Sequence, residues 1–132
     1  QLILLNTLTM QSVALTPATE SAYQPTWSPH GDAIAYVKRS TDQDDIYATP
    51  VPDWPTQDMN TEGTALINGV TAQPVWSPDG LQILFIGESG DSGFDLWTTD
   101  ITVSSGIAVK GKPTQVTSSQ QVDATSRPSW IP

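Results

Sequence analysis

Residues 74–80 read PVWSPDG, and residues 25–31 read PTWSPHG. A third copy begins with PSW at residues 128–130. The tryptophans of the first two copies are 49 residues apart (76 − 27), and those of the second and third are 54 apart (130 − 76). The similarity extends through QPTWSPHGDAIAYVKRSTDQDDIYATPV from position 24 and QPVWSPDGLQILFIGESGDSGFDLWTTDI from position 73. The chain is therefore built from a long internal repeat.

The residues after each tryptophan predict a tight turn. In Ser77-Pro78-Asp79-Gly80, proline sets the backbone dihedral of the first corner of a type I turn and aspartate tolerates the second corner. Glycine then provides the left-handed residue that follows, as in hairpin loops with a bulge. The first copy has His30 in place of the turn aspartate.

Each turn leads into an apolar run, IAYV at 34–37 and ILFI at 83–86. Because successive rather than alternate residues are apolar, both faces of each strand must be covered by other structure. Short polar loops follow these runs and lead to amphipathic strands, DIYATPV from Asp45 and DLWTTDI from Asp95.

A fourth strand completes each repeat and ends in an apolar-Thr pair, Leu15-Thr16 early in the chain and Val116-Thr117 near its end. The middle copy has Leu66-Ile67 at this place. No segment shows a helical periodicity. A period of about 40 to 50 residues with strand-like content is typical of β-propeller blades, in which each four-stranded sheet packs between two neighbours. The sequence therefore predicts an all-β protein built from blades of four antiparallel strands.

The pattern PxWSPDGxxIxF…DLW resembles the PD40, or TolB-like, β-propeller repeat. The departures from it are His30, Ile131 in place of the motif serine in the third copy, and the insertion PDWPTQDMN at 52–60. The resemblance implies the end of one blade at 1–20, whole blades at 21–70 and 71–120, and the first strand of a further blade at 121–132. About two and a half blades are thus expected, where a closed ring typically needs four to eight. The chain is then either an incomplete part of a ring or a chain that closes a ring with copies of itself or with a partner.

Composition excludes several classes of function. Fourteen Asp and Glu face only five basic residues, for a net charge of −9, so binding to nucleic acid or to an anionic membrane surface is not expected. Cysteine is absent, which excludes disulfides, thiolate metal sites and cysteine nucleophiles. The opening QLILLNTLT has only four successive apolar residues and is not expected to be a signal peptide, and no segment approaches the roughly 20 apolar residues of a membrane helix.

Two motifs could carry chemistry but favour structural roles. Gly90-Asp91-Ser92-Gly93 resembles the GDSG around a serine-protease nucleophile, yet such a serine needs a base and a group that orients it. The sole histidine, His30, occupies a turn position, which favours an exposed turn residue over a metal ligand or pH sensor. We interpret residues 87–93 as a loop between strands.

Two acidic loops could attract a hard cation such as calcium, although neither has EF-hand spacing and solvated acidic loops are common. Their members are Asp42, Asp44 and Asp45 in the first copy, and Glu88, Asp91 and Asp95 in the second. We predict no catalytic, cofactor-binding or metal-binding residue.

Five tryptophans divide into two groups. Core packing is predicted for those that recur at repeat positions, namely Trp27, Trp76 and Trp130, which share one repeat position, and Trp97, which matches Tyr47 on the third strand. Trp54 lies in the insertion and has no repeat counterpart, so it is the candidate for an exposed aromatic contact with a partner.

The resemblance implies a non-enzymatic scaffold for protein partners, or for further blades of the same or another chain, in the bacterial periplasm, cell envelope or extracellular space. Two alternatives remain open. One is the non-catalytic gating propeller of a prolyl-oligopeptidase-family serine peptidase, for which a GxSxG elbow in an α/β domain would be diagnostic, and none lies in these residues. The other is a structural subunit that assembles through open blade edges, as surface or filament proteins do.

Overall fold

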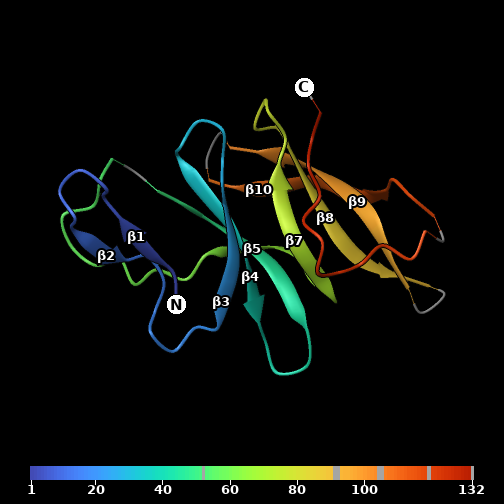
Figure 1. The fold of residues 1–132 in the computed structure, drawn as a ribbon, viewed down its shortest axis with the longest axis horizontal. Helices are drawn as coiled ribbons and strands as arrows, with labels where there is room; N and C mark the ends of the chain where they lie inside the picture. Colours follow the sequence, from blue (N-terminus) through green and yellow to red (C-terminus); the bar gives the residue numbers. More distant parts are fainter. Residues whose placement is uncertain (52, 91–92, 104–105, 119, 132) are drawn as a thin grey trace.

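The computed structural model describes residues 1–51, 53–90, 93–103, 106–118 and 120–131, which form ten β-strands and no helix. Figure 1 shows them in three sheets that follow one another along the molecule in chain order. The strands are β1 (Ile3–Leu5), β2 (Ser12–Ala14), β3 (Ala22–Trp27), β4 (Ala33–Arg39), β5 (Asp44–Pro50), β6 (Thr64–Ile67), β7 (Thr71–Trp76), β8 (Gln82–Ser89), β9 (Gly93–Thr102) and β10 (Ala108–Gln115).

Two of the sheets are complete four-stranded blades. Strands β3-β4-β5-β6 and β7-β8-β9-β10 each form an antiparallel meander, and β1 pairs only with β2. We call the contact between the β1–β2 sheet and β3–β6 the first junction, and the contact between the two complete blades the second junction. The predicted all-β architecture of an open, partial propeller is confirmed.

The predicted turns after the tryptophans are present. Gly31 and Gly80 both have φ of +73°, and their N–H groups donate to the carbonyls of Ser28 and Ser77 at 3.0 Å. This left-handed conformation is nearly free for glycine and costly for other residues. His30 is exposed in its turn, as expected.

The innermost strands β3 and β7 contain the same bulge. Gln24 and Gln73 have φ of +51° and +52°, and each precedes a proline where the pairing register of its strand shifts. The bulge frees the N–H of Gln73, which donates to the side-chain oxygen of Gln24 at 2.8 Å. A side chain of one blade therefore satisfies the irregular backbone of the next.

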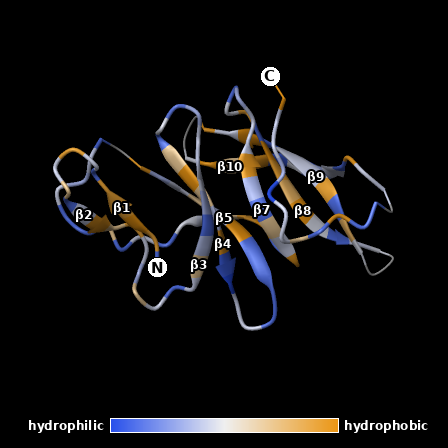
Figure 2. Cartoon of the chain, viewed as in Figure 1, coloured by the Kyte–Doolittle hydropathy of each residue, from blue (hydrophilic) through white to orange (hydrophobic). Residues whose placement is uncertain are grey.

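Each junction has its own apolar core, and β7 packs against β3, β4 and β5. The apolar runs of β4 and β8 are buried on successive residues, as predicted. β4 lies between two neighbouring sheets, whereas β8 has a neighbouring sheet on one side only. The C-terminal segment also contacts this last sheet, where the Val122 N–H donates to the Phe94 carbonyl at 2.8 Å. Figure 2 shows apolar residues concentrated along β1 and β8, while the connecting loops are largely hydrophilic.

The C-terminal segment departs from the expected first strand of a further blade. Residues 120–131 contain no strand, although the segment lies beside the innermost strand β7, where the Trp130 indole N–H donates to the Val75 carbonyl at 3.2 Å. A strand needs a hydrogen-bonded neighbour, and none of the described residues offers one there. The assignment of this segment to a further blade stays a prediction.

Candidate functional site

The equivalent tryptophans at the ends of the innermost strands β3 and β7 differ in burial. Trp76 is 6% exposed and packs at the second junction with Ala33, Ala35 and Ala48. Trp27 is 51% exposed, so the prediction that it packs in a core is wrong. Trp76 is covered by β4 and β5 of the preceding sheet. In the sheet that precedes Trp27, β1 corresponds to β5, and no described strand lies beside it in the position of β4. Trp27 therefore stays exposed. Trp130 and Trp97 are half-buried.

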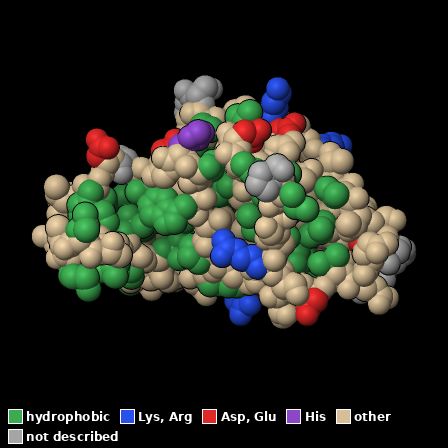
Figure 3. Space-filling model, turned by 45° about the horizontal axis from the view of Figure 1, so that its top comes forward, with side chains coloured by type: hydrophobic (Ala, Val, Ile, Leu, Met, Phe, Trp, Pro, Cys, Tyr) green, Lys and Arg blue, Asp and Glu red, His purple; other side chains and the backbone are tan. Residues whose placement is uncertain are grey.

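A hollow of about 530 Å³ lies at the first junction, next to Trp27. Leu4, Val51 and the two tryptophans Trp27 and Trp54 line it together with polar groups of His30, Asp32 and Asp53. Figure 3 shows apolar side chains gathered on this part of the molecule, beside the purple His30. The hollow therefore combines aromatic surface with an acidic rim.

The insertion that carries Trp54 is anchored on the outer edge of β2. The Ala14 N–H donates to an Asp58 carboxylate oxygen at 2.7 Å, and the N–H groups of Met59 and Thr61 donate to the carbonyls of Ala14 and Leu15 at 2.8 and 3.1 Å. These bonds cover strand edges that would otherwise attract other chains. Trp54 is 37% exposed and also lines a second hollow on its other side.

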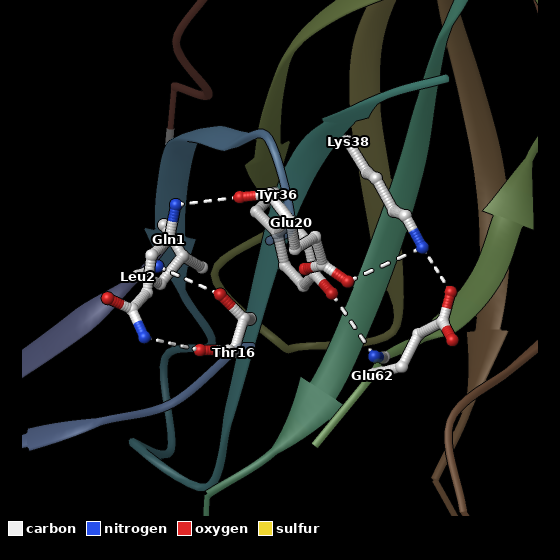
Figure 4. A network of polar contacts seen from close by, with 8 residues as sticks. Gln1, Leu2, Thr16, Glu20, Tyr36, Lys38 and Glu62 are labelled. Carbon is white, nitrogen blue, oxygen red and sulfur yellow. Dashed lines mark hydrogen bonds and ion pairs between the residues drawn. The ribbon is translucent and has the colours of Figure 1, made fainter. Parts of the chain in front are cut away.

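A polar cluster closes the other part of the first junction (Figure 4). The Lys38 ammonium pairs with the buried Glu20 at 3.4 Å and with Glu62. The Tyr36 hydroxyl accepts a hydrogen bond from the Gly63 N–H at 3.1 Å. We call these five residues the polar clamp, because they tie the blade-connecting segment, β4 and the residues before β6 together.

The pKa values of Tyr36 and Lys38 are both raised in the polar clamp. Burial raises the pKa of the Tyr36 hydroxyl well above its ordinary value, and the negative charge of Glu20 raises it further. Burial would lower the pKa of Lys38, but the hydrogen bond to Glu62 and the charge of Glu20 outweigh it and the pKa is raised. Lys38 also lies 4.7 Å above the centre of the Tyr47 ring, a cation–π contact.

At the second junction the described residues form no such clamp. Strand pairing places Phe85 opposite Trp97 as Tyr36 is opposite Tyr47, and Gly87 opposite Asp95 as Lys38 is opposite Asp45. Counting from the repeat tryptophans and from the outer-strand register, the five clamp positions become Gly69, Phe85, Gly87, Lys112 and Pro113. All five line a cavity of about 420 Å³, which we call the interblade cavity.

Three members of the acidic loops make contacts within the fold. Asp44 accepts two hydrogen bonds from the Arg39 guanidinium, at 2.9 and 3.1 Å, and these bonds hold the pKa of its carboxyl below the usual range. Asp45 is buried and accepts from the Gly69 N–H at 2.8 Å. Asp95 is also buried and accepts from the Thr117 hydroxyl at 2.8 Å. Within the described ranges, no three His, Asp or Glu side chains gather closely enough to hold a metal ion.

The candidate nucleophile of the GDSG motif, Ser92, and its neighbour Asp91 lie outside the described residues. None of the described residues forms a helix long and apolar enough to cross a membrane.

The arrangement of the blades matches a known architecture. The chain is similar to the crystal structure of TolB from Acinetobacter baumannii, with a TM-score of 0.53 and 16% sequence identity over 80% of this chain. The fold is that of a TolB-like β-propeller. The 132 residues span 25% of the TolB chain. No protein-family profile matches the sequence. The search of curated protein sequences also found no match.

The interblade cavity was missed by the sequence-based prediction. Its signal was present, since the repeat alignment places Gly87 at the position of Lys38 and Phe85 at that of Tyr36. In the first blade the Gly63 N–H donates to the Tyr36 hydroxyl, whereas the equivalent Pro113 has no N–H and the equivalent Phe85 has no hydroxyl. This correspondence can be recognised only from the strand register, because the two positions are far apart in sequence.

Proposed function

We propose that the chain is a non-enzymatic protein-interaction module, part of a TolB-like β-propeller, and that the insertion at 52–60 is its contact surface. The observation that carries the proposal is the partly exposed Trp54, held in an insertion that is anchored to β2 and has no counterpart in the other repeat. Binding residues are commonly held by loops on a rigid scaffold. Partly buried tryptophans are frequent centres of interface energy.

The surroundings of Trp54 indicate the chemistry of the partner. Trp27 and Trp54 provide aromatic surface, and Asp32 and Asp53 are exposed beside them in a chain of net charge −9. A protein segment with apolar side chains and flanking Lys or Arg fits such a surface, because aromatic faces and carboxylates both attract cations. The resemblance to the TolB-like repeat supports a bacterial periplasmic or envelope location for this interaction.

Site-specific photo-cross-linking tests the proposal. A benzophenone amino acid placed at position 54 should capture a defined partner, whereas the same group at exposed Ala108, at the start of β10, should not. With that partner purified, Trp54→Ala should weaken binding at least about tenfold, as for an interface hot spot. Equal capture at both positions, or unchanged affinity of the folded variant, would remove the insertion as the contact surface.

A further inference from the structure

The interblade cavity lies where the first junction has its polar clamp. At the first junction the space holds the side chains of Glu20, Tyr36, Lys38 and Glu62. At the second junction these positions hold smaller, uncharged or oppositely charged residues, and about 420 Å³ is open. The two junctions therefore differ at this place: polar side chains fill the space at the first junction, and a cavity lies between the two complete blades at the second.

The loss of the clamp is internally consistent. Tyr36 hydroxyl and Gly63 N–H form a hydrogen bond at the first junction, whereas Phe85 lacks the hydroxyl and Pro113 lacks the N–H. Neither change leaves an unmet hydrogen-bonding group at the site. The Lys38 side chain is replaced by Gly87, which leaves the face of the neighbouring Trp97 uncovered by a lysine.

The lining defines what the cavity can hold. Its walls are apolar, formed by Ile67, Val70, Phe85, Trp97 and Pro113. One carboxylate, Glu88, and one ammonium, Lys112, are exposed at the rim. A cation would meet the charge of Lys112 and an anion would meet that of Glu88, so an uncharged apolar occupant fits best.

Trp97 favours an aromatic ring as the occupant of the cavity. Gly87 lies close against its indole, since a Cβ added at Gly87 would come within 3.0 Å of Cδ1 and 3.3 Å of Nε1. Trp97 and Phe85 both line the cavity, and aromatic rings stack favourably on one another. The volume lies within the range of known ligand sites.

We propose that the interblade cavity binds an aromatic side chain of a partner protein, which packs against Trp97 and Phe85. This proposal adds a second contact site to the proposed function. It rests on that function in one respect, namely that the bound side chain belongs to a partner protein. It lies on a different junction from Trp54, so the two sites can be tested separately.

The probe is N-acetyl-L-phenylalaninamide, which carries one ring and two amide carbonyls, titrated into the 132-residue chain and followed by ¹H–¹⁵N NMR. The Trp97 indole and Gly87 amide signals should shift saturably, with a Kd on the order of 1 mM for a ligand of this size. N-acetyl-L-alaninamide, which has no ring, is the matched control and should cause no saturable shift.

Two variants locate the binding. Gly87→Lys combined with Trp97→Tyr transfers the Lys38–Tyr47 pair of the first blade into the second. The variant removes the Trp97 and Gly87 signals, so the amide signals of Asn68 and Thr71, which also line the cavity, are followed in both proteins, and their saturable shifts should be lost in the variant. Should that variant not fold, Val70→Trp fills the cavity from its 41% exposed rim position and should weaken binding at least tenfold. Either result supports the site.

The proposal is overturned if the folded chain shows no saturable shift up to about 10 mM probe, if the alanine control binds equally, or if shifts persist in the filled variants. Cross-linking at position 54 with no binding of the probe would overturn the cavity alone. Probe binding at the cavity without cross-linking at position 54 would overturn the insertion as contact surface and leave the cavity in place.

Discussion

Replacing Trp76 or Trp27 by alanine should have very different consequences, although both occupy the same repeat position. A tryptophan side chain offers roughly 200 Å² of surface, and burial stabilises by about 25 cal/mol per Å². Trp76 is 6% exposed, so Trp76→Ala removes nearly all of this contribution and leaves a cavity, a loss of about 5 kcal/mol. Trp27 is 51% exposed, and Trp27→Ala should cost about 2 kcal/mol, with no enclosed cavity.

Urea unfolding followed by far-ultraviolet circular dichroism measures both losses without relying on tryptophan emission. Leu81→Ala is a suitable control, because Leu81 is 56% exposed and its truncation should change the free energy of unfolding by less than about 0.5 kcal/mol. Equal losses for the two tryptophan variants would refute the inference that packing between blades, and not the repeat position, determines the energetic role of this residue.

Three further predictions concern turns, strand ends and charge. Gly80→Ala and Gly31→Ala should each destabilise by about 1–2 kcal/mol in thermal melts because both have φ of +73°, and Gly80→Ala should be the worse because its Cβ would lie 3.2 Å from a histidine ring atom; equal melts would contradict this. Thr117→Val should cost about 1–3 kcal/mol in urea unfolding, since the hydroxyl bonds a buried aspartate and a backbone N–H, and Thr117→Ser should restore most of it. Because the pKa of Asp44 is lower in the folded protein, its ionised carboxylate stabilises the fold at pH values above the ordinary aspartate pKa of about 3.9. This contribution is lost as the pH falls through the lowered pKa. Arg39→Ala should therefore raise the midpoint of the Asp44 carboxyl titration measured by ¹³C NMR, and an unchanged midpoint would contradict the role of the guanidinium.

Local features were the most predictable from sequence. The turn at Ser77-Pro78-Asp79-Gly80 needs only the dihedral preferences of its own residues, and its glycine has the expected left-handed conformation. The double-sided burial of β4 and β8 followed from successive apolar residues. The exposure of Trp27 could not be predicted, because it depends on a strand from a neighbouring sheet and not on its own repeat.

The sequence by itself determined that this protein is built from β-propeller blades, because turn chemistry and strand patterning are local and recur with the repeat. Only the tertiary structure decided where its candidate binding surfaces lie. The anchoring of Trp54 depends on hydrogen bonds between the insertion and Ala14, 44 residues from Asp58. The interblade cavity depends on Ile67 of β6 and Gly87 of β8 lining the same space across the second junction. Such sites arise from packing between sheets, where the loss of one side chain leaves space that no local propensity records.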